Sequence, residues 1–524
     1  MSGRHRWALA ALLLGLAAIM VGWLAIDRRP PEWDHANHLE RAVVCHRSLA
    51  RAGGDWLEEI IAQSSFYPPI VTCAAGLLYF VLPVVPLTAQ AVMWAFLVVG
   101  VLAVHGVGRR LIDPDAGLLA AFLFATAPFV VFSLLNFQLD LPLAGMVALA
   151  LYTLVRTEEL ARRGWVLGLG VVLGLGMLTK PPFAAYLSGP LLWTAWRALR
   201  TPGRRAHLLR LLGAIGIAAA IALPWYGPRL VGLPMQIVNR SFKQAAESGH
   251  AAALSGASLW FYPQWIIPQW GLLATGLLLW GVVALTRRPR ARGLLWAALA
   301  PFLIFLLIQN KNLRYTLPLL PAAALAAAAG VSVLPPRARL GLTWTAVAAG
   351  LVQVGSAAFA LPPATVLAPV VPSIAFSWPP DGRDWHHREI LDAVLRAAGP
   401  GRPRVAVVPN DNFFSISNFR YDVTREGLPL RLSRAWDRAP LGVDFAIVKT
   451  GDQGPDAASA RPDRIMAALD GGDPHLAAAY PVIARVPLPD GSEGMVRMRR
   501  LEPVRAVLPA ELADRLRRGV GGLL

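Results

Sequence analysis

Long apolar stretches alternate with short polar segments along most of the 524-residue chain. A helix needs roughly 17–25 predominantly apolar residues to cross a bilayer. Apolar stretches of about that length lie at residues 7–26, 89–108, 115–135, 138–156, 208–226, 264–286, 293–309, 313–333 and 340–360. The pattern therefore predicts a helical protein that crosses a membrane many times.

Two further apolar segments need separate treatment. Residues 164–198 contain Pro181 and Pro182, and because proline ends a helix, this stretch predicts two spans. Residues 67–83 begin with Pro68 and Pro69 and are short, so we predict a re-entrant or interfacial element there. The first span lacks a small-residue cleavage site and is predicted to be an uncleaved anchor. The total is eleven predicted crossings.

The basic residues of the short loops predict the orientation of these spans. Basic loops lie at residues 109–110, 156–163, 197–210, 287–292 and 337–339, and two spans separate each consecutive pair. All five loops therefore fall on one side, which is the cytoplasm by the positive-inside rule. The segments 27–88 and 227–263, with everything after about residue 361, then lie outside.

Composition agrees with this membrane assignment. Hydrophobic residues make up 55% of the chain and charged residues only 16%, whereas a soluble domain carries about 25% charged residues. The net charge of +18 follows from arginine-rich loops that face an anionic leaflet, and no basic stripe on a soluble module predicts nucleic-acid binding. The short loops and the arginine bias indicate a bacterial inner membrane. Cys45 and Cys73 are the only cysteines; they can pair in an oxidising compartment or remain two buried thiols.

Residues 361–524 differ from the rest because charge rises and apolar runs shorten to strand length. Strand-like segments lie at 404–408 and 444–448, a helical pattern at about 386–398, and a hairpin pattern at 480–500 that turns at 489–492. We therefore predict a transmembrane domain over 1–360 and a small external α/β domain over 361–524. The simplest role of the external domain is that of a lid or scaffold without chemistry.

Two acidic residues on the predicted outer face are candidates for catalysis. Asp34 follows the first span and heads a predicted juxtamembrane helix that also carries His35 and His38, which are candidate substrate-binding residues. Asp140 lies between two spans, where a carboxylate is costly unless it is paired or hydrated. Helix capping explains either residue without any catalytic role. Together they would form an acid/base or ligand-orienting pair.

Cationic and aromatic residues on the same face are candidates for substrate binding. Lys180, Lys311 and Arg314 lie at predicted span ends, where they could bind a phosphate. Favourable interaction with a helix dipole or snorkelling to the headgroups explains them equally well. Tyr226 closes one span and Arg229 follows it, at the start of a loop over 227–263 that could cover a site. An interfacial aromatic belt also accounts for Tyr226.

The ordered set of motifs resembles the GT-C glycosyltransferases, in particular glycosyltransferase family 39 with its protein O-mannosyltransferases and lipid A aminoarabinose transferases. The resemblance covers roughly the first 330 residues. It rests on the motifs Trp33-Asp34, Gly108-Arg109-Arg110, Leu139-Asp140-Leu141-Pro142, Gly174 to Pro181, Leu223-Pro224-Trp225-Tyr226 and Asn312 to Pro318. His35 stands where this family often has glutamate. The resemblance implies a polyprenyl-phosphate-sugar donor, an active site on the outer face, and Asp34 as general base.

The chemistry of such a transfer suits these residues. A base must take the proton of the acceptor hydroxyl, and cations must stabilise the departing phosphate. Asp34 would be the base and Asp140 would orient the acceptor or the sugar. The cations would bind the phosphate, and the apolar segment near 67–83 would hold the prenyl chain. Phosphate is already a good leaving group, so no cofactor is needed, although a divalent cation is possible. We expect inversion at the anomeric carbon.

Three other functions remain open at this stage. A lipid-linked sugar flippase or transporter would place ionisable residues near the bilayer midplane and often shows inverted repeats. In this sequence the ionisable residues lie at span ends, which favours an enzyme. A polysaccharide polymerase or ligase would use similar chemistry on another acceptor. A structural membrane protein with a partner-binding external domain is the third. The sequence does not distinguish a lipid, glycan or protein acceptor.

Overall fold

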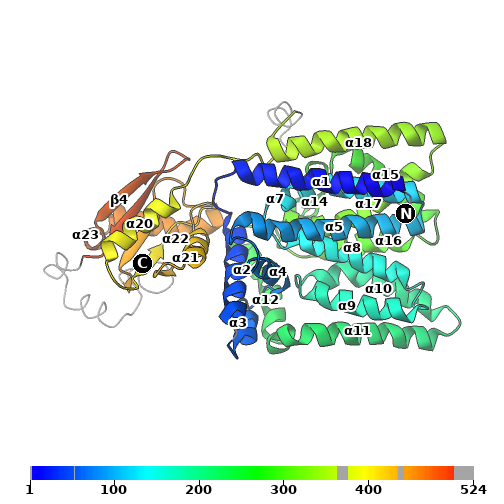
Figure 1. The fold of residues 1–524 in the computed structure, drawn as a ribbon, viewed down its shortest axis with the longest axis horizontal. Helices are drawn as coiled ribbons and strands as arrows, with labels where there is room; N and C mark the ends of the chain where they lie inside the picture. The colour runs from blue at the N-terminus through cyan, green and yellow to red at the C-terminus, as the bar shows by residue number, and fades with distance from the viewer. Residues whose placement is uncertain (1–2, 52, 363–375, 435–441, 501–524) are drawn as a thin grey trace. The chain divides into compact units, whose positions relative to one another are not determined.

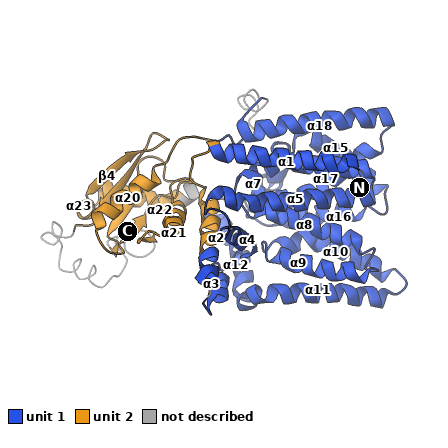
Figure 2. Cartoon of the chain, viewed as in Figure 1, with its two compact units in different colours: residues 1–25, 45–380 blue, residues 26–44, 381–524 orange. Residues whose placement is uncertain are grey.

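The computed structural model describes residues 3–51, 53–362, 376–434 and 442–500. They form two compact units, coloured separately in Figure 2. Unit 1 comprises residues 1–25 and 45–380, and unit 2 comprises residues 26–44 and 381–524. Helix α2 therefore begins in unit 2 and ends in unit 1. The sequence had grouped all of residues 27–88 with the transmembrane part.

Unit 1 is helical, and its long helices lie alongside one another in Figure 1. Its elements are α1 (Gly3–Ile26), the end of α2 (Trp33–Arg51), α3 (Trp56–Ala62), α4 (Ile70–Leu78), α5 (Pro86–Leu111), α6 (Pro114–Ala125), α7 (Pro128–Leu135), α8 (Asp140–Arg156), α9 (Arg163–Met177), α10 (Phe183–Leu199), α11 (Arg204–Tyr226), η1 (Gly227–Arg229), α12 (Gly232–Ser241), α13 (Lys243–Glu247), α14 (Gly256–Trp270), α15 (Leu272–Thr286), α16 (Gly293–Leu307), η2 (Leu313–Leu319), α17 (Leu320–Ser332) and α18 (Pro336–Phe359). Proline occupies the first helical position of α5, α6, α7 and α18, where its missing N–H is not needed.

Within the described residues, five helices are long and apolar enough to span a membrane, or seven if each of two bent pairs counts as one span. The prediction of a multi-span helical membrane protein is confirmed. The break at Pro181–Pro182 is also confirmed, because α9 ends at Met177 and α10 begins at Phe183. Helix α4 has only nine residues, which agrees with a non-spanning element at 67–83.

The predicted span 264–286 was wrong in its boundaries. Helix α14 begins at Gly256, within the predicted loop 227–263, and is bent by 117° from α15 at Gly271. Gly271 has a φ of +96°, a conformation that glycine adopts without steric cost. The rest of the predicted loop carries helices α12 and α13. Hydropathy alone did not separate α14 from α15, because the residues on both sides of Gly271 are apolar.

Close packing of helix pairs holds unit 1 together. Helix α5 packs against α6 and α8, α9 against α11, α10 against α16, and α15 against α17. A Cβ on Gly281 of α15 would lie 1.8 Å from the backbone oxygen of Ala326 on α17, so only glycine allows this approach. Small residues permit the same closeness in membrane helices generally, where packing drives association.

Unit 2 contains a five-stranded mixed sheet and confirms the small α/β domain predicted from the sequence. The strands are β1 (Arg404–Val407), β2 (Arg431–Ser433), β3 (Phe445–Lys449), β4 (Val482–Pro487) and β5 (Glu493–Met498), in the order β2-β1-β3-β5-β4. Strand β1 pairs in parallel with β2 and β3, whereas β3–β5 and β5–β4 are antiparallel. The helical elements are α20 (His387–Ala398), α21 (Ile416–Glu426), α22 (Asp456–Ala467), η4 (Ala468–Gly472) and α23 (Pro474–Ala479). The predicted helix, both strand segments and the hairpin are all present.

Candidate active site

The five basic loops meet at one end of unit 1, as predicted from their spacing. Polar contacts join them: Arg110 to Glu158 (3.8 Å), Arg197 to Glu159 (2.5 Å), and Arg339 to Asp113 (2.8 Å). Arg288 donates to Ser332 and Arg210 to the backbone of Leu160. We call the loops 109–115, 156–163, 197–210, 287–292 and 332–339 the basic end of unit 1.

The segments predicted to lie on the opposite face also converge. Arg229 donates to the backbone oxygens of Ile61 (2.5 Å) and Ser64 (3.0 Å). The Arg240 guanidinium lies 3.9 Å from the centroid of the Phe66 ring. The Asn310 backbone N–H donates to Ser241. We call the segments 61–67, 140, 177–186, 226–250, 262–269 and 305–316 the site end of unit 1.

A buried ion pair lies at the site end. The Lys180 ammonium donates to Asp140 Oδ1 at 2.7 Å, and the two side chains are only 8% and 2% exposed. Helix α8 begins at Asp140, and Lys180 lies in the break between α9 and α10. The two candidates that the sequence placed on one face therefore touch. The second carboxylate oxygen, Asp140 Oδ2, is buried with no hydrogen-bond partner among the described residues.

Tyr186 and Tyr315 lie in the same region as this ion pair. The Tyr186 hydroxyl donates to the backbone oxygen of Tyr315 at 2.8 Å, and the Tyr315 ring stacks on Phe305. The electrostatic neighbours of the Tyr315 hydroxyl are Tyr67, Arg314, Asp140 and Arg240. An unpartnered carboxylate oxygen, cations and hydroxyl groups thus occupy the same region. Such a set can orient a polyhydroxylated ligand and hold an anion.

The side chains of Lys311, Tyr226 and Arg229, which were also predicted to bind substrate, donate hydrogen bonds to backbone oxygens. The Lys311 ammonium donates to the carbonyl oxygens of Phe305, Leu306 and Ile308, which caps the end of α16. The Tyr226 hydroxyl donates to Met177 at 2.9 Å. Arg229 donates to Trp225 in addition to Ile61 and Ser64. These hydrogen bonds support structural roles for the three residues, and their contacts with substrate stay predictions.

Asp34, the predicted general base, lies in the first turn of α2 within unit 2 and is partly exposed. His35 and His38 on the same turns are buried, at 1% and 3% exposure, and His35 faces Glu32 at 3.7 Å. Three residues between 412 and 420 anchor this helix. Asn412 accepts from the Trp33 N–H, Asn418 donates to Pro31, and Arg420 makes two hydrogen bonds to Glu40.

The segment that precedes α2 is fixed in the same way. The Asp27 carboxylate accepts from the Asp381 N–H at 2.8 Å and from Arg29 at 2.7 Å. Burial raises the pKa of Asp27 above its usual value, against the lowering effect of the Asp381 hydrogen bond and of Arg29. The Arg28 N–H donates in turn to the Asp381 oxygen. Asp381 thus holds the segment before α2, and residues 412–420 hold the start of α2, where Asp34 lies.

Sequence reasoning missed several polar residues of the site end. Tyr186 and Gln269 lie in largely apolar helices, and Tyr315 follows Arg314 in η2; a tyrosine at a span end is typical of an interfacial belt. Gln269 donates to the backbone of Leu313 and accepts from Thr316. A glutamine within a predicted span was the one available signal, because an amide in hydrocarbon requires partners. Within the described residues, no group of three or more His, Cys, Asp or Glu side chains could hold a metal ion.

Comparison with known proteins gives one family match and several structural matches. Residues 68–226 match the family model described as dolichyl-phosphate-mannose-protein mannosyltransferase. The fold is similar to that of ArnT from Cupriavidus metallidurans bound to undecaprenyl phosphate, with a TM-score of 0.61 and 16% identity over 94% of this chain and 98% of that one. The apo form of the same ArnT matches with a TM-score of 0.59 and 17% identity, over 97% and 100% of the two chains. A search of curated proteins finds no significant sequence match.

Proposed function

We propose that the chain is a membrane glycosyltransferase of the GT-C type, which transfers a sugar from a polyprenyl-phosphate donor to an acceptor at the site end. The match of residues 68–226 to the dolichyl-phosphate-mannose-protein mannosyltransferase model and the ArnT-like fold support this proposal. The observation that carries this proposal is the buried Asp140–Lys180 ion pair, which lies within the family-matched segment. In this proposal the protein crosses a bacterial inner membrane eleven times. Its basic end faces the cytoplasm by the positive-inside rule, so its site end is extracytoplasmic.

The proposed reaction is a single displacement. Asp34 takes the proton of the acceptor hydroxyl as its oxygen bonds to the anomeric carbon. The bond between that carbon and the phosphate oxygen breaks, and polyprenyl phosphate leaves with the bonding electrons. Because attack and departure occur on opposite faces, the anomeric configuration inverts. These steps need no metal ion, because phosphate is already a good leaving group. A divalent cation could add to the stabilisation of the negative charge on the departing phosphate.

The roles of the remaining residues follow from their surroundings. Asp140 Oδ2 is free to accept a hydrogen bond from a sugar or acceptor hydroxyl, while the Lys180 ammonium holds Asp140 Oδ1. We assign the phosphate to Arg314, whose guanidinium donates to the Asn312 side chain at this end of unit 1. Lys180, which is bound to Asp140, adds a second positive charge that stabilises the departing phosphate. Tyr226 and Arg229 shape the site by fixing α11 and the 61–64 segment.

The prenyl chain has a candidate surface beside the site. Large apolar side chains are exposed at the end of α4 and after it, among them Leu77, Phe80 and Val81. Lipid covers such side chains in a membrane, so the chain of the donor can lie against them. The acceptor remains a lipid, glycan or protein. A flippase and a polysaccharide polymerase or ligase are the competing functions.

The test compares the wild-type protein with Asp34→Asn in membranes supplied with a panel of polyprenyl-phosphate sugars. The measured quantity is free polyprenyl phosphate released per minute. We expect sugar-specific release by the wild type and a loss of roughly 10²–10⁴-fold in the variant, the usual contribution of a general base. Asp55→Asn, an exposed carboxylate of the same external segment, is the matched control and should retain activity.

Each alternative has its own signature in this experiment. Equal release from the wild type and Asp34→Asn would keep the enzyme but remove Asp34 as its base, which would leave Asp140 as the next candidate. Binding of a donor without any release would contradict the transferase and favour the flippase. Release only in the presence of a growing glycan would favour the polymerase.

A further inference from the structure

A pocket lies at the basic end of unit 1, far from the proposed active site. Its volume is about 610 Å³, and residues of α5, α8, α10, α11 and α16 line it together with their loops. Helix α8 joins the two regions: its 17 residues place Asp140 and Arg156 about 24 Å apart along the helix axis. The pocket therefore cannot share a ligand headgroup with the Asp140–Lys180 region.

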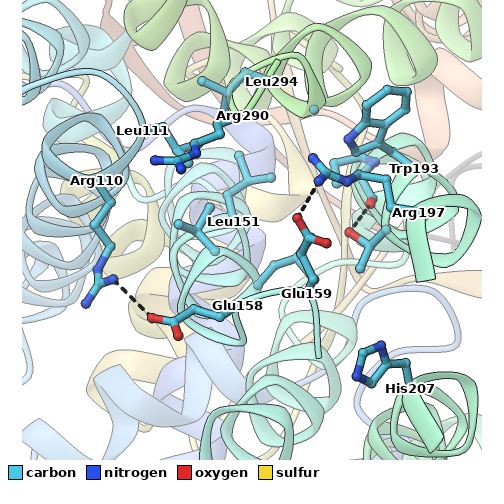
Figure 3. A pocket seen from close by; sticks show the side chains of 15 residues that line it. Arg110, Leu111, Leu151, Glu158, Glu159, Trp193, Arg197, His207, Arg290 and Leu294 are labelled. Carbon is cyan, nitrogen blue, oxygen red and sulfur yellow. Dashed lines mark hydrogen bonds and ion pairs between the residues drawn. The ribbon is translucent and has the colours of Figure 1, made fainter. Parts of the chain in front are cut away.

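The charges in this pocket favour an anion. Arg110, Arg197 and Arg290 line it, against two carboxylates, Glu158 and Glu159. Figure 3 shows Arg110 directed at Glu158 and Arg197 directed at Glu159, the two ion pairs measured at 3.8 and 2.5 Å. The structure records no hydrogen bond or ion pair for Arg290 within its described residues, so one lining guanidinium is available to a ligand.

The rest of the lining is apolar. Leu151 and Leu154 of α8, Trp193 of α10 and Leu294 of α16 contribute to the wall. A volume of this size accommodates a small molecule or the head of a lipid and exceeds what a free phosphate ion fills. Three guanidiniums beside leucine and tryptophan side chains, at the ends of apolar helices, match a ligand with a phosphate at one end and a hydrocarbon chain at the other.

The backbone that presents the two carboxylates is strained. Glu158, Glu159 and Leu160 have φ values of +50°, +59° and +70°, three consecutive non-glycine residues in the left-handed region. Burial and hydrogen bonds hold this turn in place. Leu160 is fully buried, its N–H donates to Thr157, and Arg210 donates to its carbonyl oxygen. Strain of this kind persists where the surrounding structure enforces it, and it concentrates at functional sites.

We propose that this pocket binds the phosphate headgroup of a lipid from the leaflet at the basic end. The phosphate contacts Arg290 and competes with Glu158 and Glu159 for Arg110 and Arg197, while the first part of the hydrocarbon chain lies against Leu151, Trp193 and Leu294. The left-handed turn keeps both carboxylates in place, so that Arg110 and Arg197 are paired when no lipid is bound. The lipid is either a phospholipid of the membrane or a polyprenyl phosphate, which share this chemistry.

The test uses the full-length protein in nanodiscs of zwitterionic lipid with a trace of phosphatidic acid that carries a photoreactive group beside its headgroup. After irradiation, mass spectrometry locates the cross-linked peptides. We expect labelling within residues 151–160, 190–197 and 290–294. The double variant Arg197→Gln/Arg290→Gln should lower this labelling at least tenfold. The matched control Arg204→Gln/Arg287→Gln removes two arginines of the same loops that do not line the pocket, and should change it less than twofold.

A third variant separates binding from folding. Glu159→Gln removes a competing carboxylate and should raise labelling about two- to threefold, which a merely destabilised protein would not do. Competition identifies the source of the ligand. If phosphatidylglycerol suppresses the labelling at a lower concentration than polyprenyl phosphate does, the ligand is a membrane phospholipid. If polyprenyl phosphate suppresses it at the lower concentration, the ligand is the carrier lipid. Equal labelling of the double variant, labelling only at the site end, or equal competition by unphosphorylated polyprenol would each overturn the proposal.

Discussion

The two ends of the helices of unit 1 both carry ion pairs, but the two environments differ. At the basic end, Arg110–Glu158 and Arg197–Glu159 are solvent-accessible, with side chains between 31% and 45% exposed. At the site end, Lys180 and Asp140 are almost completely buried. An exposed pair contributes about 0–1 kcal/mol because water and salt screen it. A buried pair costs several kcal/mol of desolvation per ion, which the partner and its hydrogen bonds must offset.

This difference indicates different purposes for similar residues. Exposed pairs can exchange partners at little cost, which suits the reversible binding of a lipid phosphate. A buried pair cannot exchange partners without leaving a charge in a medium of low polarity. The Asp140–Lys180 pair therefore fixes one carboxylate oxygen and leaves the other without a hydrogen-bond partner among the described residues, which suits a site that must orient a substrate.

Removal of one member of the buried pair is the strongest test of this comparison. Lys180→Met leaves the Asp140 carboxylate buried without its cation, and we expect a loss of about 3–5 kcal/mol of unfolding free energy. The double variant Asp140→Leu/Lys180→Met should recover most of that stability and none of the transferase activity. Thermal unfolding in detergent and donor turnover measure the two quantities. Recovery of activity by the double variant would show that the pair is structural only.

The disulfide between Cys45 and Cys73 gives the second largest expected effect. Cys45 and Cys73 are joined across 28 residues and tie α2 to α4, on either side of the segment that Arg229 holds. Replacing both cysteines with alanine should lower stability by about 2–4 kcal/mol, because the open chain gains conformational freedom when unfolded. Reducing agent should lower the melting temperature of the wild type but not that of the double alanine variant. A wild type that does not respond to reductant would contradict a bond in the mature protein.

Loss of one exposed pair should have the smallest effect. We expect Arg197→Gln to change the unfolding free energy by less than about 1 kcal/mol, because both partners remain accessible to water. Raising the salt concentration should weaken even this contribution, whereas the effect of Lys180→Met should be nearly independent of salt. A loss of several kcal/mol in Arg197→Gln would show that the left-handed turn at Glu158–Leu160 depends on this ion pair.

The sequence predicted the class of the fold well because hydropathy acts over whole segments. Apolar runs of fixed length, prolines at helix starts and arginine in alternate loops each carry their information locally. The same holds for the hairpin at 482–498, where Asp490 and Gly491 lie in the turn between two antiparallel strands. The bend at Gly271 was missed because hydropathy does not report the direction of a chain. Composition likewise could not tell whether α2 belongs with the helices or with the sheet.

By itself, the sequence determined that this is a multi-span helical membrane protein with a small α/β domain and a set of candidate polar residues. Only the tertiary structure decided which of these residues meet. It paired Asp140 with Lys180 across 40 residues, assigned Lys311 to a helix end and joined Cys45 to Cys73. It also revealed the strained turn beneath Glu158. The physical reason is that burial and pairing depend on neighbours distant in the chain, and these interactions determine what a charge can do.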